Sequence, residues 1–386
     1  MQAITSDAGG EAVAVRKKRV PFLIGLAAGA VGVAWLFLAA DGPGLSDDES
    51  LVFFPTLGQR TPDGNGWVLD LHGWVFEPAD SEKYLGALKA ALEIDRIEAV
   101  AAPPEIFLGR AAWFLVDNER DKRIRVRIGD GEFDSDPSTP DGHFRGRAEV
   151  SEAFVQNLRA SGQLSGGVLG YDAVIPPDRN ETFRGGVLLV DAEGVSVISD
   201  IDDTIRVSHV REKAEMLKGT FLLPFVAAPG MAGLYRDWSK RPSVRFHYVS
   251  ASPWQLYPVL SAFFESCGFP AGSYHLKEFR WKDSRFFSLF ESGEEYKLRS
   301  IEPLLARFPS RRFVLIGDSG EKDPEAYGEL ARKRPDQIIG IAIRDVTEVS
   351  ADAPRYVEAF RGVPPGKWRV FREPDEIRDM MPDDGE

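Results

Sequence analysis

The stretch VSVISDIDDT, residues 195–204, decides the fold, because a short apolar run leads straight into a cluster of acidic residues. Four more apolar runs of strand length follow it, and segments with helical periodicity separate them. The apolar runs are 244–250, 274–279, 312–317 and 338–343, and the helical segments are 254–267, 297–308 and 324–334. Strands that alternate with helices predict an α/β fold in which a parallel sheet is covered on both faces.

Three of the predicted strands end in polar residues. Asp200 and Asp202 follow the first strand, Ser250 ends the second, and the fourth runs into GDSGEKD, which contains Asp318 and Asp323. Because the carboxyl ends of parallel strands meet at one edge of the sheet, we expect these side chains to converge. Crowded carboxylates raise one another's pKa unless a cation neutralises them, and Mg²⁺ prefers oxygen ligands. Each acidic motif alone could be a surface loop or a helix cap, but together they predict a magnesium site.

Composition narrows the function further. The chain of 386 residues has 60 acidic and 47 basic residues and a formal net charge of −13, which argues against nucleic acid as a partner. Its single cysteine, Cys267, excludes an intrachain disulfide and a cysteine-based metal site. Any bound metal is therefore expected to be a hard cation held by carboxylates.

The N-terminus has the pattern of a membrane anchor. Residues 1–19 end in Arg16-Lys17-Lys18-Arg19, and residues 20–40 form a stretch without a charge. Such a stretch is long enough to cross a bilayer core of about 30 Å. The pattern predicts a transmembrane helix at 20–40, a cytoplasmic tail at 1–19 and a catalytic domain on the non-cytoplasmic (periplasmic or extracellular) side. A cleaved signal peptide is the alternative.

Two further domains are expected after the anchor. Residues 41–190 comprise a linker and short alternating apolar stretches separated by Gly, Asp and Pro, which predict a β-rich, sandwich-like domain. Only 81–94 and 151–158 look helical in this part. Residues 191–386 carry the α/β pattern and every candidate catalytic residue.

The motifs also resemble a known family. A strand followed by DxDxT, a strand followed by Ser, a lysine at a helix start and GDxxxxD are similar to the haloacid dehalogenase superfamily of phosphotransferases. DIDDTIRVSHV (200–210), FHYVSASPWQLYP (246–258) and LIGDSGEKDPEAY (315–327) resemble the catalytic domain of the App1 family of phosphatidate phosphatases. GWVFEP, VDNERDKRIRVRI and DGHF resemble that family's N-terminal region, so the resemblance covers roughly residues 50–375. It implies a Rossmann-like parallel sheet of the haloacid dehalogenase type.

The resemblance implies a role for each site residue. Asp200 would attack phosphorus and form an aspartyl-phosphate, Asp202 would act as general acid and base, and Ser250 would hydrogen-bond a phosphoryl oxygen. Lys297 would balance the phosphoryl charge, with Lys277 and Lys282 as alternatives.

The same resemblance implies the ligands of Mg²⁺. Asp200, Asp318 and the backbone carbonyl of Asp202 would hold the ion, and Asp323 would bind it directly or through water. Thr204 is expected to fix the loop after Asp202.

The expected substrate follows from what the chain lacks. About 45 residues separate the DxDxT motif from Ser250, and about as many separate Ser250 from Lys297, so neither gap has room for a large cap domain. An open site suits phosphatidic acid or another lipid phosphate presented at a membrane, and nearby aromatic residues fit a lipid headgroup. These are Trp254, Trp281, Phe286, Phe287 and Phe290. We expect a phosphatase that converts phosphatidic acid to diacylglycerol; a phosphatase of protein or soluble phosphate esters and a non-catalytic binding protein are the alternatives.

Overall fold

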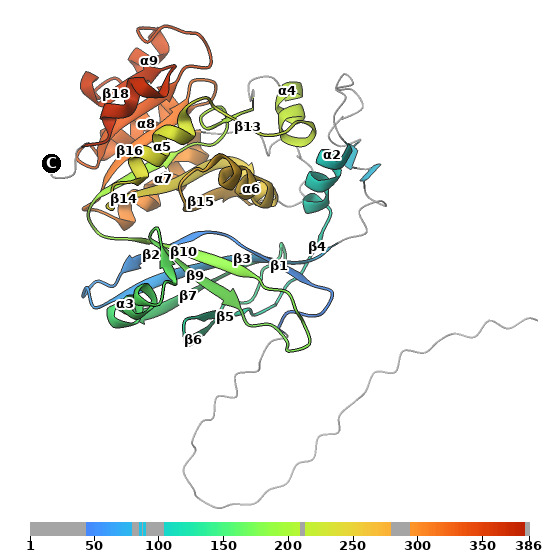
Figure 1. The fold of residues 1–386 in the computed structure, drawn as a ribbon. Coiled ribbons are helices and arrows are strands. Elements are labelled where there is room, and N and C mark those ends of the chain that lie inside the picture. The colour runs from blue at the N-terminus through green and yellow to red at the C-terminus, as the bar shows by residue number, and fades with distance from the viewer. Residues whose placement is uncertain are drawn as a thin grey trace, which may run out of the picture. The chain divides into compact units, whose positions relative to one another are not determined.

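The structure is a computed structural model that describes residues 44–78, 85–86, 88–89, 104–208, 213–278 and 294–382. Residues Asp41–Glu386 form one compact unit. Within the described residues, a ten-stranded sheet is built from the N-terminal part and a six-stranded sheet from the C-terminal part (Figure 1).

The C-terminal sheet is entirely parallel and has the order β15-β14-β11-β16-β17-β18. Its central strand, β11, has the sequence VSVIS and is buried at all five positions. Strands with both faces covered read as continuous apolar runs, which explains this sequence. In chain order the strands are β11 (Val195–Ser199), β14 (Val244–Pro253), β15 (Gly272–Lys277), β16 (Arg312–Asp318), β17 (Ile338–Arg344) and β18 (Trp368–Phe371).

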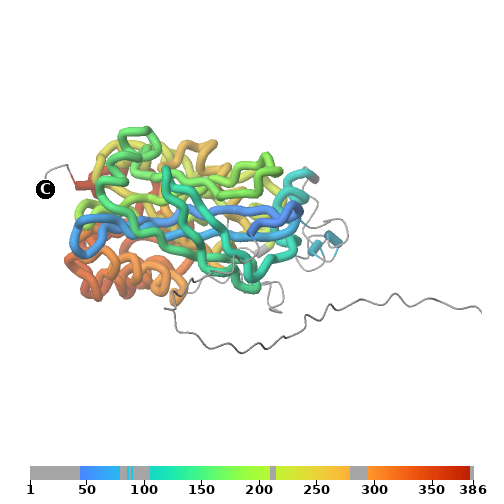
Figure 2. Tube along the Cα trace, turned by 90° about the horizontal axis from the view of Figure 1, so that it is seen from below, coloured from blue at the N-terminus to red at the C-terminus, as the bar shows by residue number. Residues whose placement is uncertain are grey.

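Helices cover both faces of this sheet. Because successive side chains of a strand point to opposite faces, Val197 packs in one apolar cluster and Ile198 in another. The first cluster contains α5 (Met231–Ser239) and α6 (Tyr257–Cys267), and the second contains α7 (Glu294–Arg307), α8 (Asp323–Lys333) and α9 (Pro354–Ala359). Figure 2 shows the yellow helical turns on one side of the unit and the orange ones on the other.

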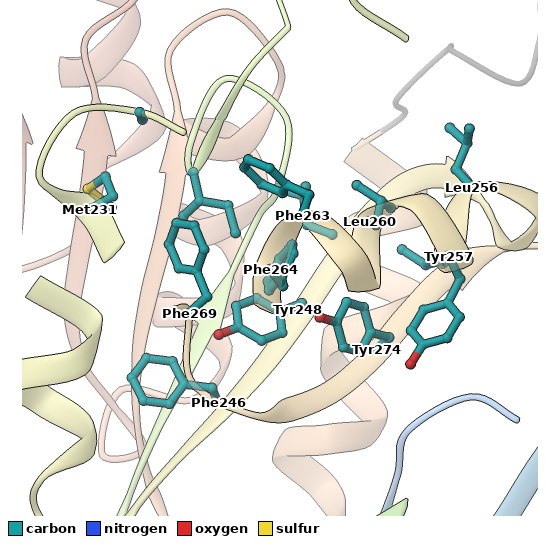
Figure 3. Packing of buried hydrophobic residues seen from close by; sticks show 14 of the residues in the cluster. Met231, Phe246, Tyr248, Leu256, Tyr257, Leu260, Phe263, Phe264, Phe269 and Tyr274 are labelled. Carbon is teal, nitrogen blue, oxygen red and sulfur yellow. The ribbon is translucent and has the colours of Figure 1, made fainter. Parts of the chain in front are cut away.

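Aromatic packing attaches α6 to the sheet. The rings of Phe264 on α6 and Tyr248 on β14 meet edge to face, with centroids 4.5 Å apart (Figure 3). Tyr274 on β15 packs against both rings. The helix ends at Gly268, whose φ of 70° lies in the left-handed region that glycine adopts without strain.

The N-terminal sheet is mixed and largely antiparallel, and β2 and β10 pair in parallel. Its strands are β1 (Ser50–Phe53), β2 (Thr56–Arg60), β3 (Gly66–Glu77), β4 (Asp117–Asn118), β5 (Arg125–Ile128), β6 (Gly131–Asp134), β7 (His143–Ser151), β8 (Leu164–Ser165), β9 (Val168–Ala173) and β10 (Arg184–Val190). Helices α2 (Pro104–Ala111) and α3 (Glu152–Ala160) accompany it. Ser151 caps α3 by accepting a hydrogen bond from the Phe154 amide.

Short elements complete the described chain. β12 (Arg206–Val207) and β13 (Val226–Ala227) form an antiparallel pair. Along the chain, both strands come after β11 and before β14. α4 (Lys213–Leu217) lies between them and continues as a π-helix (Lys218–Leu222). Single turns occur at Ala112–Phe114, Trp254–Leu256 and Pro365–Lys367, and a longer 3₁₀ segment spans Pro374–Met380.

The two sheets share packing and hydrogen bonds. The rings of Phe54 and Trp254 lie 4.3 Å apart and belong to one apolar cluster. Nε of Arg245 on β14 donates to the carbonyl of Leu189 on β10 at 2.8 Å. A domain boundary between residues 190 and 191 stays a prediction.

The predicted transmembrane helix requires a correction. No helix among the described residues is both long and apolar enough to cross a bilayer. The longest of them, α7, has 14 residues, and its length of about 21 Å falls short of a hydrocarbon core of about 30 Å. Residues 20–40, where we expected the anchor, lie outside the described residues. The structure therefore does not support the N-terminal transmembrane helix in the predicted fold or the single-pass localisation derived from it.

Candidate active site

A tight turn after β11 positions the two aspartates of the DxDxT motif. The Asp200 amide donates to the carbonyl of Ile316 on the neighbouring strand at 2.8 Å. Asp203 has a φ of 54°, in the left-handed region, and its carboxylate accepts a hydrogen bond from the Ser208 amide at 2.7 Å. Arg344 on β17 donates to the Asp203 carbonyl at 2.7 Å. These bonds hold the turn against the carboxyl edge of the sheet.

Three carboxylates converge beside this turn. Oxygen atoms of Asp200, Asp318 and Asp323 lie within 4.8 Å of one another, and all three residues are buried. Burial raises the pKa of Asp200 well above its usual range, and the carboxylates of Asp323 and Glu321 raise it further against the opposing effect of Lys297. Burial likewise raises the pKa of Asp318, and Asp323 and Asp200 add to the effect.

Lys297 supplies the positive charge of this group. Its side chain is 1% exposed, and Nζ lies 2.8 Å from Asp323 Oδ1 and 3.4 Å from Glu321 Oε2. It also donates a short hydrogen bond to Asp200 Oδ1. Although burial lowers the pKa of Lys297, the carboxylates, with Asp200 foremost, raise it well above its usual value.

The other two candidate lysines are not in this group. Lys277, at the end of β15, lines a separate cavity beside Arg145 and Arg307. Lys282 lies outside the described residues.

Asp202 has a different environment from Asp200. Its Oδ1 accepts from Nε of Arg206 at 2.9 Å and also from Nη2 of the same guanidinium. Its Oδ2 accepts from the hydroxyls of Ser250 at 3.1 Å and Ser252 at 2.9 Å. Burial alone would raise the pKa of Asp202, but Arg206 and the two serines lower it below the usual value.

The three converging carboxylates fit a hard cation. Asp318 Oδ1 accepts from the amides of Gly320 at 2.6 Å and Glu321 at 3.1 Å. The second oxygen, Oδ2, is buried and has no hydrogen-bond partner among the described residues. A buried carboxylate oxygen without a donor is costly unless it binds something, and carboxylate oxygens suit magnesium. Asp200, Asp318 and Asp323 would hold such an ion.

Sequence reasoning missed three residues of the site. Arg206, Ser252 and Glu321 line a small cleft of about 20 Å³ together with Asp202 and Ser250. Met216 and Thr220, from α4 and the π-helix, line the same cleft. Two signals were available: Arg206 stands four residues after Asp202, and Ser252 stands two residues after Ser250 in the motif SAS.

The predicted aromatic lipid contacts are not supported where the structure describes them. Trp254 is 4% exposed and packs against Phe54 and His72 in the core. The other four aromatic residues named for this role lie outside the described residues.

Comparison with known proteins identifies the module that carries this site. Residues 195–345 match the family model described as "Phosphatidate phosphatase APP1, catalytic domain". Phosphatidate phosphatase APP1 of Saccharomyces cerevisiae is 34% identical over 183 residues, which are 46% of this chain and 30% of that protein. An uncharacterised protein of Schizosaccharomyces pombe is 35% identical over 170 residues, 43% of this chain and 27% of its own. The chain thus spans less than a third of the length of these relatives.

A solved Thermotoga maritima structure named for a beta-phosphoglucomutase covers 48% of this chain and 96% of its own. The TM-score is 0.28 at 13% identity, which is too low to indicate a shared fold. The segment matched by the family model contains all the predicted site residues, namely Asp200, Asp202, Ser250, Lys297, Asp318 and Asp323. The family model and the 34% identity to the yeast protein confirm the resemblance noted in the sequence: residues 195–345 are similar to the catalytic domain of the App1-type phosphatidate phosphatases.

Proposed function

We propose that this chain is a phosphomonoester hydrolase of the haloacid dehalogenase type that acts on phosphatidate. The observation that carries the proposal is the contrast between two aspartates two positions apart. Asp200 lies in a carboxylate group with Lys297, whereas Asp202 is held by Arg206 and two serines. Asp200, beside Lys297 and the carboxylates that could hold a cation, suits a nucleophile, and Asp202, outside that carboxylate group, suits a general acid and base.

Asp200 is suited to attack phosphorus. A carboxylate oxygen of Asp200 would form the new bond to phosphorus as the bond to the leaving alkoxide breaks. Thr204 donates to Asp200 Oδ2 at 3.1 Å and Lys297 donates to Oδ1, so both oxygens are oriented before substrate arrives. Asp202, which its hydrogen-bond donors keep ionised before substrate binds, would take a proton from the phosphomonoester monoanion and pass it to the leaving alkoxide. It would then take a proton from the water that cleaves the aspartyl-phosphate, which releases phosphate and restores Asp200.

The buried carboxylates of Asp200, Asp318 and Asp323 would hold a cation beside the phosphoryl group. When bound, Mg²⁺ would neutralise the carboxylates and the charge that gathers on the phosphoryl oxygens. Lys297 would keep the charge balanced from the other side of Asp200, and Ser250 would orient the phosphoryl group through its hydroxyl.

Support for phosphatidate comes from the named yeast relative and from the family model, whose match over residues 195–345 includes the whole site. A soluble phosphate ester is the second candidate substrate, because Asp202, Ser250 and Lys297 contact any phosphomonoester in the same way. The site itself recognises the phosphoryl group, and the two candidates differ only in the leaving group.

The test measures phosphate release by the full chain with Mg²⁺, from phosphatidate in detergent micelles and from a panel of soluble phosphate esters. We expect release from phosphatidate and its loss in Asp200→Asn, since the change keeps the shape and removes the nucleophile. Asp237→Asn, the same change at a half-buried position on α5 away from the site, should retain activity. Release from soluble esters alone would favour the second candidate. Activity in Asp200→Asn above about a tenth of wild type would remove Asp200 from its role.

A further inference from the structure

Arg206 contacts the carboxylate of Asp202 with two of its nitrogens and has no role in the chemistry described so far. The side chain is 2% exposed, and both Nε and Nη2 donate to a single oxygen, Oδ1. The other oxygen of Asp202, Oδ2, accepts only hydroxyl donors from Ser250 and Ser252 among the contacts that the structure describes. The two oxygens of one carboxylate therefore have partners of different chemical kinds.

This difference decides which oxygen is able to carry a proton. The N–H groups of a guanidinium can only donate, because arginine stays protonated. A proton on Oδ1 would point at those donors, so this oxygen is reserved as an acceptor. Serine hydroxyls rotate and can accept as well as donate, so the partners of Oδ2 can rearrange when a leaving group approaches this oxygen.

Arg206 is also held in place by groups other than Asp202. Its guanidinium lies 4.2 Å from the centroid of the Phe225 ring, and the guanidinium of Arg110 lies 4.0 Å from the same centroid. The Arg206 amide donates to the Ile201 carbonyl at 2.9 Å. Stacking and backbone pairing of this kind fix the direction of the side chain before any ligand binds.

We infer that Arg206 is a positioning residue that reserves Oδ1 of Asp202 and so presents Oδ2 to the leaving group. The inference rests on the proposed function, in which Asp202 is the general acid and base. Oδ2 of Asp202 then transfers the proton to the oxygen of the departing alkoxide, and Arg206 acts only through Asp202. Ser250 and Ser252 hold the second oxygen on the side that lines the cleft.

A competing role for Arg206 is direct binding of the phosphoryl group. Its third nitrogen, Nη1, is buried and has no hydrogen-bond partner among the described residues, and Arg206 lines the cleft. A phosphate ligand and a positioning residue differ in one measurable way. Loss of a phosphate contact slows every phosphate ester alike, whereas loss of acid positioning slows only esters whose leaving group needs a proton.

The experiment therefore compares two leaving groups in the full chain with Mg²⁺. Phosphatidate in micelles releases a basic alkoxide, and p-nitrophenyl phosphate releases a stable phenolate that needs little protonation. In Arg206→Gln we expect kcat/KM on phosphatidate, which covers the steps up to departure of the leaving group, to fall about 100-fold, the scale of general acid catalysis. On p-nitrophenyl phosphate kcat/KM should fall by less than about fivefold. Arg206→Lys keeps one donor and the charge, and should recover part of the loss.

Two further variants keep the test decisive. In the Asp202→Asn background, Arg206→Gln should cause no additional loss on phosphatidate, since both changes remove one shared function. Arg311→Gln changes another buried arginine, one whose contacts lie outside the site, and should leave the ratio of the two rates as in wild type even where it lowers the melting temperature. If Arg206→Gln does not fold, the rate ratio of Arg206→Lys takes its place.

The outcomes separate this inference from the proposed function. Equal losses on both esters in the Arg206 variants would overturn the positioning role and indicate a phosphate ligand. If Asp202→Asn itself shows no dependence on the leaving group, the proposed role of Asp202 fails instead. A dependence in Asp202→Asn without one in Arg206→Gln leaves the proposed function intact and rejects only the role of Arg206.

Discussion

Nζ of Lys297 lies 2.8 Å from Oδ1 of Asp323, although the two residues belong to different helices. The contact closes a buried group in which one ammonium faces several carboxylates, so the charges do not balance without a further cation. These residue types suit a site that binds a metal ion beside a phosphoryl group. The stability of the group should therefore depend on both Lys297 and the bound metal ion.

Lys297→Met should abolish most activity and lower the melting temperature without Mg²⁺. Removing one partner of a buried ion pair typically costs about 3–5 kcal/mol, because the remaining charge is left unpaired. Added Mg²⁺ should then stabilise the variant more than wild type, since it neutralises the same carboxylates. The measurement is the melting temperature over a magnesium titration. Lys333→Met, which removes an exposed lysine with two surface partners, should change neither quantity appreciably. An unaltered magnesium response in Lys297→Met would contradict the shared role.

Asp318→Ala should flatten the dependence of the melting temperature on Mg²⁺. A ligand that binds only the folded state stabilises it by mass action, and Asp318 offers a buried oxygen without any other partner among the described residues. EDTA should remove both the stabilisation and the activity of wild type. A wild-type magnesium response in Asp318→Ala, or full activity in EDTA, would show that the carboxylates do not hold the ion.

The geometry of a parallel sheet explains which residues of the site could be predicted from the sequence. Asp200, Ser250 and Asp318 could be assigned to one edge because each stands at the end of an apolar run in the sequence, and strand direction then determines where these ends meet. The predicted runs at 195–199 and 312–317 correspond to β11 and β16 almost to the residue. β18, a strand of four half-buried to buried residues, has no such run and was not anticipated.

Other features depend on contacts that spacing does not reveal. Arg206 reaches Asp202 only because Asp203 adopts a left-handed φ and turns the chain back. Lys297 could be preferred to Lys277 by its place at a helix start, but its position beside Asp323 depends on how α7 packs against α8. Trp254 has the composition of a lipid contact and the burial of a core residue, and only tertiary packing distinguishes the two.

Histidine burial predicts that stability falls as the pH is lowered from about 6.5 to about 4. Burial, with help from Arg307 and Arg145, lowers the pKa of His275 from 6.5 to about 4. In that pH interval the unfolded chain binds a proton at this position and the folded chain does not. The stability that neutral His275 contributes is therefore fully present above pH 6.5 and declines below it. In His275→Gln, the free energy of unfolding, measured with urea, should decrease less between pH 7.5 and 5.5 than in wild type. The difference between the two proteins isolates His275 from the carboxylates, and identical slopes would contradict its neutral state.

Helices α8 and α9 approach each other closely at Gly328 and Ala359. A Cβ at Gly328 would lie 2.0 Å from the carbonyl oxygen of Ala359, whereas a Cβ at Gly233 on α5 would meet nothing within 4 Å. Gly328→Ala should therefore force the helices apart and destabilise the fold by about 1–3 kcal/mol. Gly233→Ala should gain up to about 1 kcal/mol from helix propensity alone. Because α8 begins at Asp323, a displaced helix should also weaken the magnesium response, which Gly233→Ala should leave unchanged. Urea unfolding and the magnesium titration measure both effects, and a Gly328→Ala protein as stable as wild type would show that α8 and α9 do not meet at this distance.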